Sequence, residues 1–239
     1  MTRYIIKRLK LPVIMLLLTT VIQACGEAAN SEQNEISETT ELADSIDHSD
    51  IQDSFYLSFI DSVYTISGLT GGELIIQNSF PKGGGHIDTN FVVGYKDPFE
   101  THYGYGVFWS HLINHSEDQL KFDIRFSSDS LVLEEIPESY FKLYLPTDSM
   151  NLKNVMQHNY GIQGLRAYLD TNVHKPSRLE IELKPGESAA FFVASLIYKP
   201  DGPVRAALMV EDGKLSYRIA MLRHGQVIIP CGEMHVLKN

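Results

Sequence analysis

Cysteine is scarce in this sequence, with only Cys25 and Cys231 among 239 residues. Two cysteines allow at most one disulfide bond, and none remains if Cys25 carries a covalent modification. We therefore expect a core that is held by apolar burial alone. Cys231 is predicted to be a small buried thiol. Pairing between two molecules and a thiol dyad with His224 or His235 are the alternatives.

Positive charge is also in short supply. The chain has 20 Lys and Arg against 30 Asp and Glu, which gives a net charge of −10, and four of the cations lie in its first ten residues. Without those four the remaining net charge is −14. No Lys/Arg cluster occurs beyond this leader, so the chain lacks the basic surface that neutralises phosphates. Nucleic acid is therefore excluded as a partner.

No hydrophobic run is long enough for a membrane-spanning helix. The longest, Leu11–Ala24, has about fourteen residues, whereas a transmembrane helix needs roughly twenty. It follows four basic residues and ends immediately before a cysteine. A basic start, a short apolar core and a small residue before the cut are the parts of an export signal. Residues 1–24 are therefore predicted to be a signal peptide.

The sequence Ile22-Gln23-Ala24-Cys25 resembles the cleavage site of bacterial lipoproteins, although Gln23 is not the usual small residue at minus two. The resemblance implies that the Cys25 thiol takes a diacylglyceryl group and that the mature protein carries two or three acyl chains. One acyl chain attaches a protein only marginally, and additional chains make the attachment lasting. Gly26 stands where aspartate would retain such a protein at the inner membrane. The resemblance thus implies an outer-membrane lipoprotein that faces the periplasm or the cell surface.

Residues 25–53 are predicted to be a disordered acidic linker. After the cysteine this segment holds nine carboxylates, no Lys or Arg, and only four large aliphatic residues. Like charges spaced three apart repel one another on a helix, and so little apolar surface cannot offset the entropy of ordering the chain. We expect the linker to hold residues 54–239 away from the bilayer.

Residues 54–239 read as an all-β domain. Apolar and polar residues alternate from Leu120 to Phe126, and a first strand is expected from Phe55 through Phe59. Asp212-Gly213 between two apolar runs predicts a tight hairpin. The alternation breaks over 147–172, where the spacing of apolar residues fits one short helix. Many short strands with frequent turns predict an antiparallel β-sandwich, immunoglobulin-like but elaborated, with a helical insertion near 147–172.

Three loop motifs resemble those of a group of uncharacterised bacterial lipoproteins. They are Ser79-Phe80-Pro81-Lys82-Gly83-Gly84-Gly85, Leu145-Pro146-Thr147-Asp148-Ser149-Met150 and Ile229-Pro230-Cys231-Gly232. The resemblance would cover most of the chain after Asp53. These are loop and turn patterns without known chemistry, so the resemblance carries no catalytic residue to this chain.

A metal site is the first candidate for chemistry. His86 and Asp88 lie two apart after three glycines, and with His102 folded alongside they would supply two imidazoles and a carboxylate. The alternative is a surface loop in which these polar groups cap turns. His111 and His115 have a helical metal-ligand spacing, but Leu112 replaces the glutamate of a zinc-protease motif and the segment reads as strand. We therefore do not expect a metal site there.

The richest aromatic stretch runs from residue 99 to residue 109. If Tyr103, Tyr105 and Trp109 are exposed, they form a platform that stacks on a sugar ring or anchors a partner. If they are buried, they are sandwich core, which the alternation around Trp109 favours.

No catalytic set is recognisable, since the chain lacks a Gly-x-Ser-x-Gly motif. We predict a membrane-anchored, non-enzymatic module that needs no cofactor and binds a protein or glycan. A metal-assisted hydrolase and a carbohydrate-binding module are the alternatives.

Overall fold

The computed structural model describes residues 56–84, 86–88, 91–222 and 224–237, and for 86–88 and 91–93 the backbone alone. The predicted signal peptide, Cys25 and the linker lie outside the described residues. They therefore stay predictions, as does the domain boundary at residue 54.

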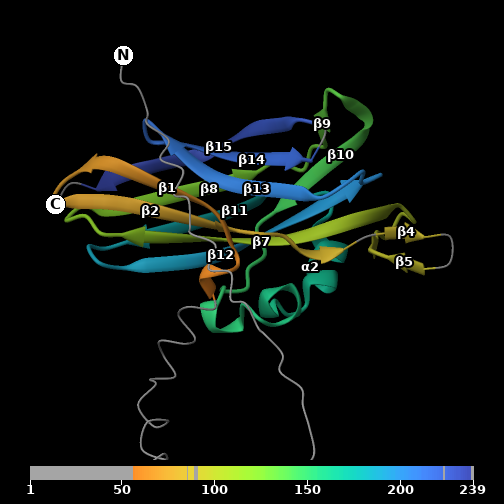
Figure 1. The fold of residues 1–239 in the computed structure, drawn as a ribbon, viewed down its shortest axis with the longest axis horizontal. Coiled ribbons are helices and arrows are strands. Elements are labelled where there is room, and N and C mark those ends of the chain that lie inside the picture. The colour runs from red at the N-terminus through yellow and green to blue at the C-terminus, as the bar shows by residue number, and fades with distance from the viewer. Residues whose placement is uncertain (1–55, 85, 89–90, 223, 238–239) are drawn as a thin grey trace, which may run out of the picture. The chain divides into compact units, whose positions relative to one another are not determined.

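Two antiparallel sheets face each other, as predicted for a β-sandwich (Figure 1). The order in the first sheet is β1 (Ile60–Leu69), β2 (Gly72–Ser79), β7 (His102–Asn114), β12 (Ser188–Tyr198), β10 (Ile136–Tyr144) and β9 (Leu131–Leu133). Two short strands, β3 (Lys82–Gly84) and β6 (Tyr95–Lys96), also pair with β7. The order in the second sheet is β11 (Ser177–Leu183), β8 (Gln119–Phe126), β15 (Gln226–Leu237), β14 (Lys214–Met221) and β13 (Val204–Glu211). A separate hairpin pairs β4 (His86–Asp88) with β5 (Phe91–Val93).

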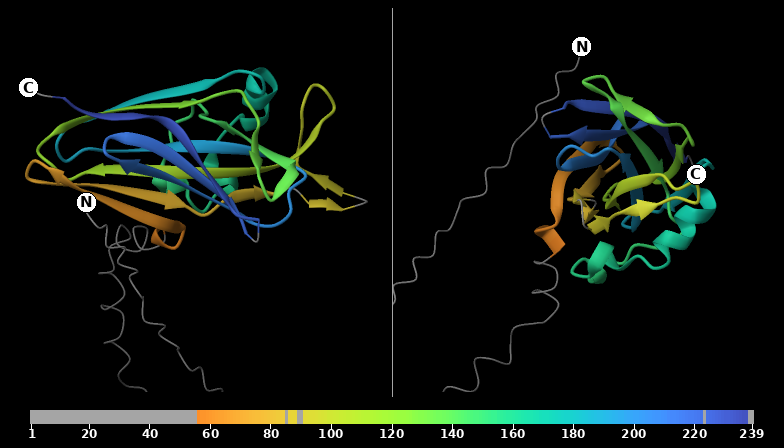
Figure 2. Two further views of the ribbon diagram at one scale, coloured as in Figure 1. Left: turned by 90° about the horizontal axis from the view of Figure 1, so that it is seen from above. Right: turned by 90° about the vertical axis from the view of Figure 1, so that its right-hand side faces the viewer.

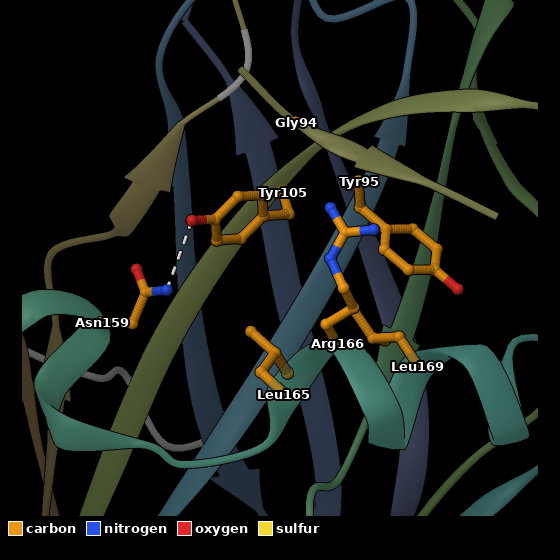
Figure 3. Close-up of a pocket in the computed structure, with 7 residues that line it drawn as sticks. All are labelled: Gly94, Tyr95, Tyr105, Asn159, Leu165, Arg166 and Leu169. Atoms are coloured by element: carbon orange, nitrogen blue, oxygen red, sulfur yellow. Dashed lines mark hydrogen bonds between the residues drawn. The ribbon is translucent and has the colours of Figure 1, made fainter. Parts of the chain in front are cut away.

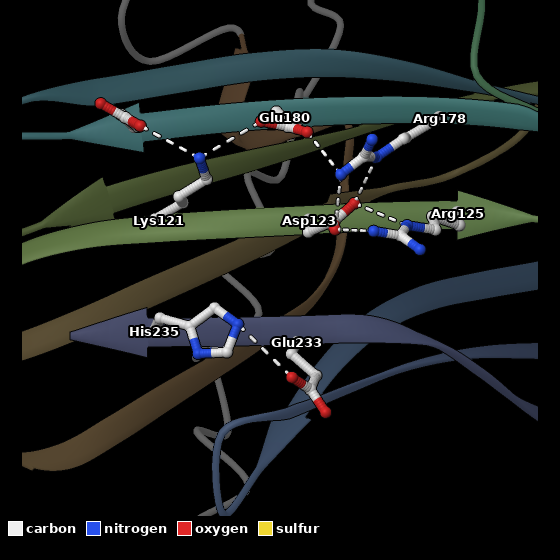
Figure 4. A network of polar contacts seen from close by, with 8 residues as sticks. Lys121, Asp123, Arg125, Arg178, Glu180, Glu233 and His235 are labelled. Carbon is white, nitrogen blue, oxygen red and sulfur yellow. Dashed lines mark hydrogen bonds and ion pairs between the residues drawn. The ribbon is translucent and has the colours of Figure 1, made fainter. Parts of the chain in front are cut away.

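Strand β8 shows why the sequence folds as a sandwich. Leu120, Phe122 and Ile124 are fully buried in the core between the sheets. The residues between them lie on the outer face, where Asp123 accepts hydrogen bonds from Arg125 and Arg178 (Figure 4). These two guanidinium groups lower the pKa of the Asp123 carboxyl. Such exposed ion pairs add little stability. Apolar burial on the other face therefore decides the orientation of the strand.

Strand β7 is buried on both faces. Phe108 and Leu112 point into the core between the sheets, whereas Val107 and Trp109 belong to a second apolar cluster on the opposite side. That side is covered by the predicted insertion, which forms η1 (Leu152–Asn154), η2 (His158–Gly161) and α2 (Leu165–Asn172) (Figures 1 and 2). The expectation of one short helix in 147–172 is confirmed.

Two glycine-containing turns follow from the sequence. Asp212 and Gly213 have φ angles of 49° and 75°, which are the two left-handed residues that a type I′ hairpin requires. The turn predicted between β13 and β14 is therefore confirmed. In the closing motif, Gly232 has φ 140°, and a Cβ built there lies 1.8 Å from the Asp123 carbonyl oxygen. Gly232 is thus required where β15, which bulges against β14 at this point, passes close to the backbone of β8.

The predicted start of the first strand is wrong. Tyr56 lies in a helical turn that closes with a hydrogen bond from the Phe59 N–H to the Tyr56 carbonyl at 3.0 Å, and β1 begins only at Ile60. Of the alternating apolar residues, Leu57 is exposed and Phe59 lies in the turn. Tyr56 packs against Trp109 and Phe59 against Tyr160. Contacts with the second apolar cluster override the local pattern.

Candidate functional site: a pocket between β7 and α2

A cavity of about 150 Å³ opens where the insertion meets the outer face of the first sheet (Figure 3). The lining residues come from the sheet and from the insertion: Gly94, Tyr95, Tyr105, Asn159, Leu165, Arg166 and Leu169. At about 30 Å³ per liquid water molecule, the cavity holds roughly five waters. It is smaller than the sites that enclose drug-sized ligands. Its volume therefore suits one small ring or one protruding group of a larger molecule.

Asn159 supplies the amide of the pocket. Its Nδ2 donates a hydrogen bond of 3.3 Å to the Tyr105 hydroxyl, while its Oδ1 is buried and has no hydrogen-bond partner (Figure 3). Rotating the amide by 180° would exchange the two atoms and still leave one of them unpaired. Buried polar groups are normally satisfied, so an unpaired amide oxygen is unusual. It is closed off from solvent, so the group of this pair that a ligand can reach is the Tyr105 hydroxyl.

The backbone at Asn159 is held in an unusual conformation. Asn159 and Tyr160 both have positive φ, at 49° and 60°, where residues other than glycine are strained and asparagine is among the best tolerated. Tyr160 fixes the segment from below: its hydroxyl donates to the Phe80 carbonyl at 2.6 Å and its ring meets Trp109 edge-on. The strain is thus supported by packing that aims the Asn159 amide toward Tyr105.

Lys82 fastens the same segment to the sheet. Its ammonium group donates to the Val155 carbonyl and, at 2.9 Å, to the Gln157 carbonyl. It also lies over the rings of Phe59 and Tyr160, 4.6 and 4.5 Å from their centroids. Burial lowers the pKa of Lys82. Lys82, which precedes the three glycines of the first loop motif, therefore has a structural role: it holds the insertion against the first sheet.

The other side of the pocket carries a guanidinium group. Arg166 is exposed on α2 and lies 5.9 Å from the centre of the Tyr95 ring. In the described part of the chain no carboxylate forms an ion pair with it. With no such partner among the described residues, its N–H groups can donate to a ligand. Burial and the nearby Asp170 carboxylate raise the pKa of Tyr95, so this wall is a neutral phenol.

The predicted aromatic residues separate into two groups. Trp109 is fully buried and Tyr103 is 5% exposed, so neither side chain offers a face to a ligand, and the expectation that Trp109 is core is confirmed. Tyr105 is partly exposed and lines the pocket. Of the proposed platform, only Tyr105 reaches a cavity.

The predicted metal site is described only in part. His102 is exposed at the start of β7, and the side chains of His86 and Asp88 lie outside the described residues. Within the described chain, no three His, Cys, Asp or Glu residues are grouped to hold an ion. His111 is buried, with its Nδ1 3.2 Å from Gln77 Oε1, whereas His115 is exposed. The His86, Asp88 and His102 site therefore stays a prediction.

Cys231 is buried in the core, as predicted. It is 2% exposed among apolar residues, and burial raises the pKa of its thiol to about 12. His235 and His224 pair with Glu233 and Asp201 at 3.4 and 2.8 Å. No hydrogen bond joins Cys231 to either imidazole among the described residues. The thiol is thus held as a neutral hydrophobe, and the alternative of a thiol dyad is not supported by this arrangement.

Tyr95, Asn159 and Arg166 were not predicted from the sequence. The only sequence signal for Asn159 was its place before Tyr160-Gly161, in a segment where the strand alternation breaks.

No protein-family model matches the chain, and a search of curated proteins finds no match. In the portion of the chain that the structure describes, no helix is both long and apolar enough to cross a membrane.

Proposed function

We propose that this protein is a lipid-anchored, extracytoplasmic binding module that holds one sugar residue in the pocket between β7 and α2. The observation that carries the proposal is the Tyr105 hydroxyl, which lies at the pocket, accepts a hydrogen bond from Asn159 Nδ2 and keeps its own proton for a ligand. A sugar hydroxyl both donates and accepts, so it can take this proton.

The walls of the pocket suit the other properties of a sugar. A pyranose ring has an apolar C–H face and a polar rim. The ring of Tyr105 and the side chain of Leu165 offer apolar contact, while Arg166 offers donors at the mouth. A purely apolar ligand would cover the Tyr105 hydroxyl without giving its proton an acceptor, at a cost of about 1–3 kcal/mol. A polyhydroxylated ligand therefore fits this chemistry best.

The leader supports an anchored location. Its basic start, short apolar run and Cys25 favour acylation, and the acidic linker would give the domain reach from the bilayer. The test is Cys25→Ser in the full chain. We expect the substituted protein to leave the membrane fraction and to lose incorporation of radiolabelled palmitate. Retention in that fraction with the label lost would contradict the lipid anchor.

Sugar binding is tested on the full-length protein extracted in a polyoxyethylene detergent, since maltoside detergents are themselves sugars. The probes are malto-, cello-, xylo- and chito-oligosaccharides of one to six units, with binding measured by calorimetry. Removing one hydrogen-bonding group in the pocket, by Tyr105→Phe or Arg166→Gln, is expected to weaken binding about tenfold. The matched controls Tyr64→Phe and Lys153→Gln lie outside the pocket and should change affinity less than twofold. Equal losses in pocket and control variants, or no binding by the unsubstituted protein, would refute the proposal.

A further inference from the structure

Phe99 is the most exposed large apolar side chain of the described residues, at 69%. It lies in the turn between β6 and β7. A single exposed hydrophobic residue needs no explanation by itself. Phe99 is of interest because its position is fixed and because both elements beside it continue the walls of the pocket.

The turn that carries Phe99 is tied together by Asp97. The buried carboxylate of Asp97 accepts hydrogen bonds from the N–H groups of Phe99 and Thr101, at 2.9 and 2.8 Å. Its backbone N–H donates to the Thr101 carbonyl, and its carbonyl accepts from the Glu100 N–H, both at 3.0 Å. These four bonds hold the turn in one conformation. Little conformational entropy is therefore lost when the Phe99 ring contacts a ligand.

On its other side Phe99 meets the end of α2. Its ring lies 5.0 Å from the centre of the His174 ring in an edge-on contact. His174 follows α2 and lies five residues beyond Leu169, a pocket residue. At 1.5 Å per residue, Leu169 lies about 4.5 Å along the helix from its last residue, Asn172, and two further residues lead to His174. Likewise, Tyr95 of the pocket precedes Asp97 by two residues. The segment that follows Tyr95 and the segment that follows α2 are thus in contact through Phe99 and His174.

We infer that Phe99 and His174 form a second binding position, and that the ligand is a chain of at least two linked sugar residues. The first residue occupies the pocket, and the next stacks on the exposed face of Phe99. This inference rests on the proposed sugar site, because it extends that site along α2. Aromatic faces receive the apolar face of a sugar without requiring a fixed pattern of hydroxyls. Phe99 therefore senses chain length, whereas Asn159 and Tyr105 sense the identity of the first residue.

The experiment compares Phe99→Ala and Phe99→Trp with Leu222→Ala, a control at another exposed apolar residue. The full-length protein and the oligosaccharide series of the preceding section are used. Phe99→Ala is expected to weaken binding of the disaccharide and longer chains about fivefold and to leave monosaccharide affinity within twofold. Phe99→Trp should restore the affinity for longer chains, and Leu222→Ala should have no effect.

The outcomes separate this inference from the proposed function. If Phe99→Ala leaves binding of every chain length unchanged while Tyr105→Phe weakens it, the second position is refuted and the pocket stands. If Phe99→Ala weakens monosaccharide and longer chains equally, Phe99 acts on the pocket and the second position is also refuted. If no oligosaccharide binds the unsubstituted protein, both proposals fail together.

Discussion

Asn78 joins the two sheets through one buried side chain. Its Oδ1 accepts from the Leu208 N–H and from the Ser110 hydroxyl, both at 2.8 Å, and its Nδ2 donates to the Leu208 carbonyl at 3.1 Å. Leu208 belongs to β13, the edge strand of the second sheet. The amide of Asn78 therefore takes the place of a neighbouring peptide group and satisfies this buried edge.

Replacing Asn78 with alanine removes all three bonds at once. The Leu208 N–H, the Leu208 carbonyl and the Ser110 hydroxyl would be left without these partners inside the core, at about 1–3 kcal/mol for each unsatisfied group. Partial relaxation and entry of water reduce the sum, so we expect Asn78→Ala to lower the free energy of unfolding by about 3–5 kcal/mol. This is a large share of the stability of an ordinary domain. Ser110→Ala removes one bond and should cost about 1 kcal/mol.

Chemical unfolding of the full chain, followed by tryptophan fluorescence of the buried Trp109, measures these differences. Asn78→Asp provides a second test, because a buried carboxylate cannot donate to the Leu208 carbonyl until it is protonated. Burial raises the pKa of such a group, so the stability deficit of Asn78→Asp should shrink as the pH falls below its folded-state pKa. A loss under 1 kcal/mol for Asn78→Ala, with an unchanged denaturant slope, would refute this account of the inter-sheet bond.

Three further predictions follow from the described contacts. Gly232→Ala should lower the free energy of unfolding by about 3 kcal/mol or more, because the new Cβ would meet the Asp123 carbonyl. The control Gly84→Ala, whose Cβ would have nothing within 4 Å, should cost little. Equal unfolding midpoints for the two variants would contradict this. Burial lowers the pKa of His111 to about 4, so the unfolded chain binds the proton first and stability should fall as the pH drops from about 6.5 toward 4. His111→Gln should flatten this dependence in unfolding titrations, and an unchanged slope would count against it. Lys82→Met should speed amide hydrogen exchange in residues 152–161, because Lys82 no longer holds the Val155 and Gln157 carbonyls. The control Lys153→Met, at an exposed lysine, should not. Equal exchange rates in the two variants would show that Lys82 does not hold this segment.

The position of a strand was predictable from the sequence where one face of the strand is exposed to solvent. Strand β8 alternates because its outer residues reach solvent, and Asp212-Gly213 specifies its turn by backbone conformation alone. The first strand was misplaced because Tyr56 packs against Trp109 of β7 and Phe59 against Tyr160 of the insertion, contacts that no local pattern encodes. Strand β7 carries apolar residues on both faces. Its sequence therefore indicated that both faces are buried, but not that the insertion covers the outer face.

The pocket was less predictable for a similar reason. Tyr105 and Asn159 are 54 residues apart and meet only after the insertion folds back over the sheet. Tyr105 was singled out for its aromatic ring. Trp109, which has the same parity, lies beneath Tyr160 in a closed part of the same surface. Alternation identifies the face of a strand, but it does not show where along that face the cover stops.

The hydroxyl groups on this face show why the opening lies at Tyr105. Tyr144 and Tyr168 donate to the carbonyls of Val173 and Leu145, at 3.0 and 2.9 Å, so those two phenols hold the cover to the sheet. The Tyr105 hydroxyl instead accepts from Asn159, whose own amide is only half used. A ligand hydroxyl that enters at Tyr144 or Tyr168 must break a bond to the backbone. At Tyr105 it takes the free phenolic proton and breaks no bond, so recognition costs least at this position.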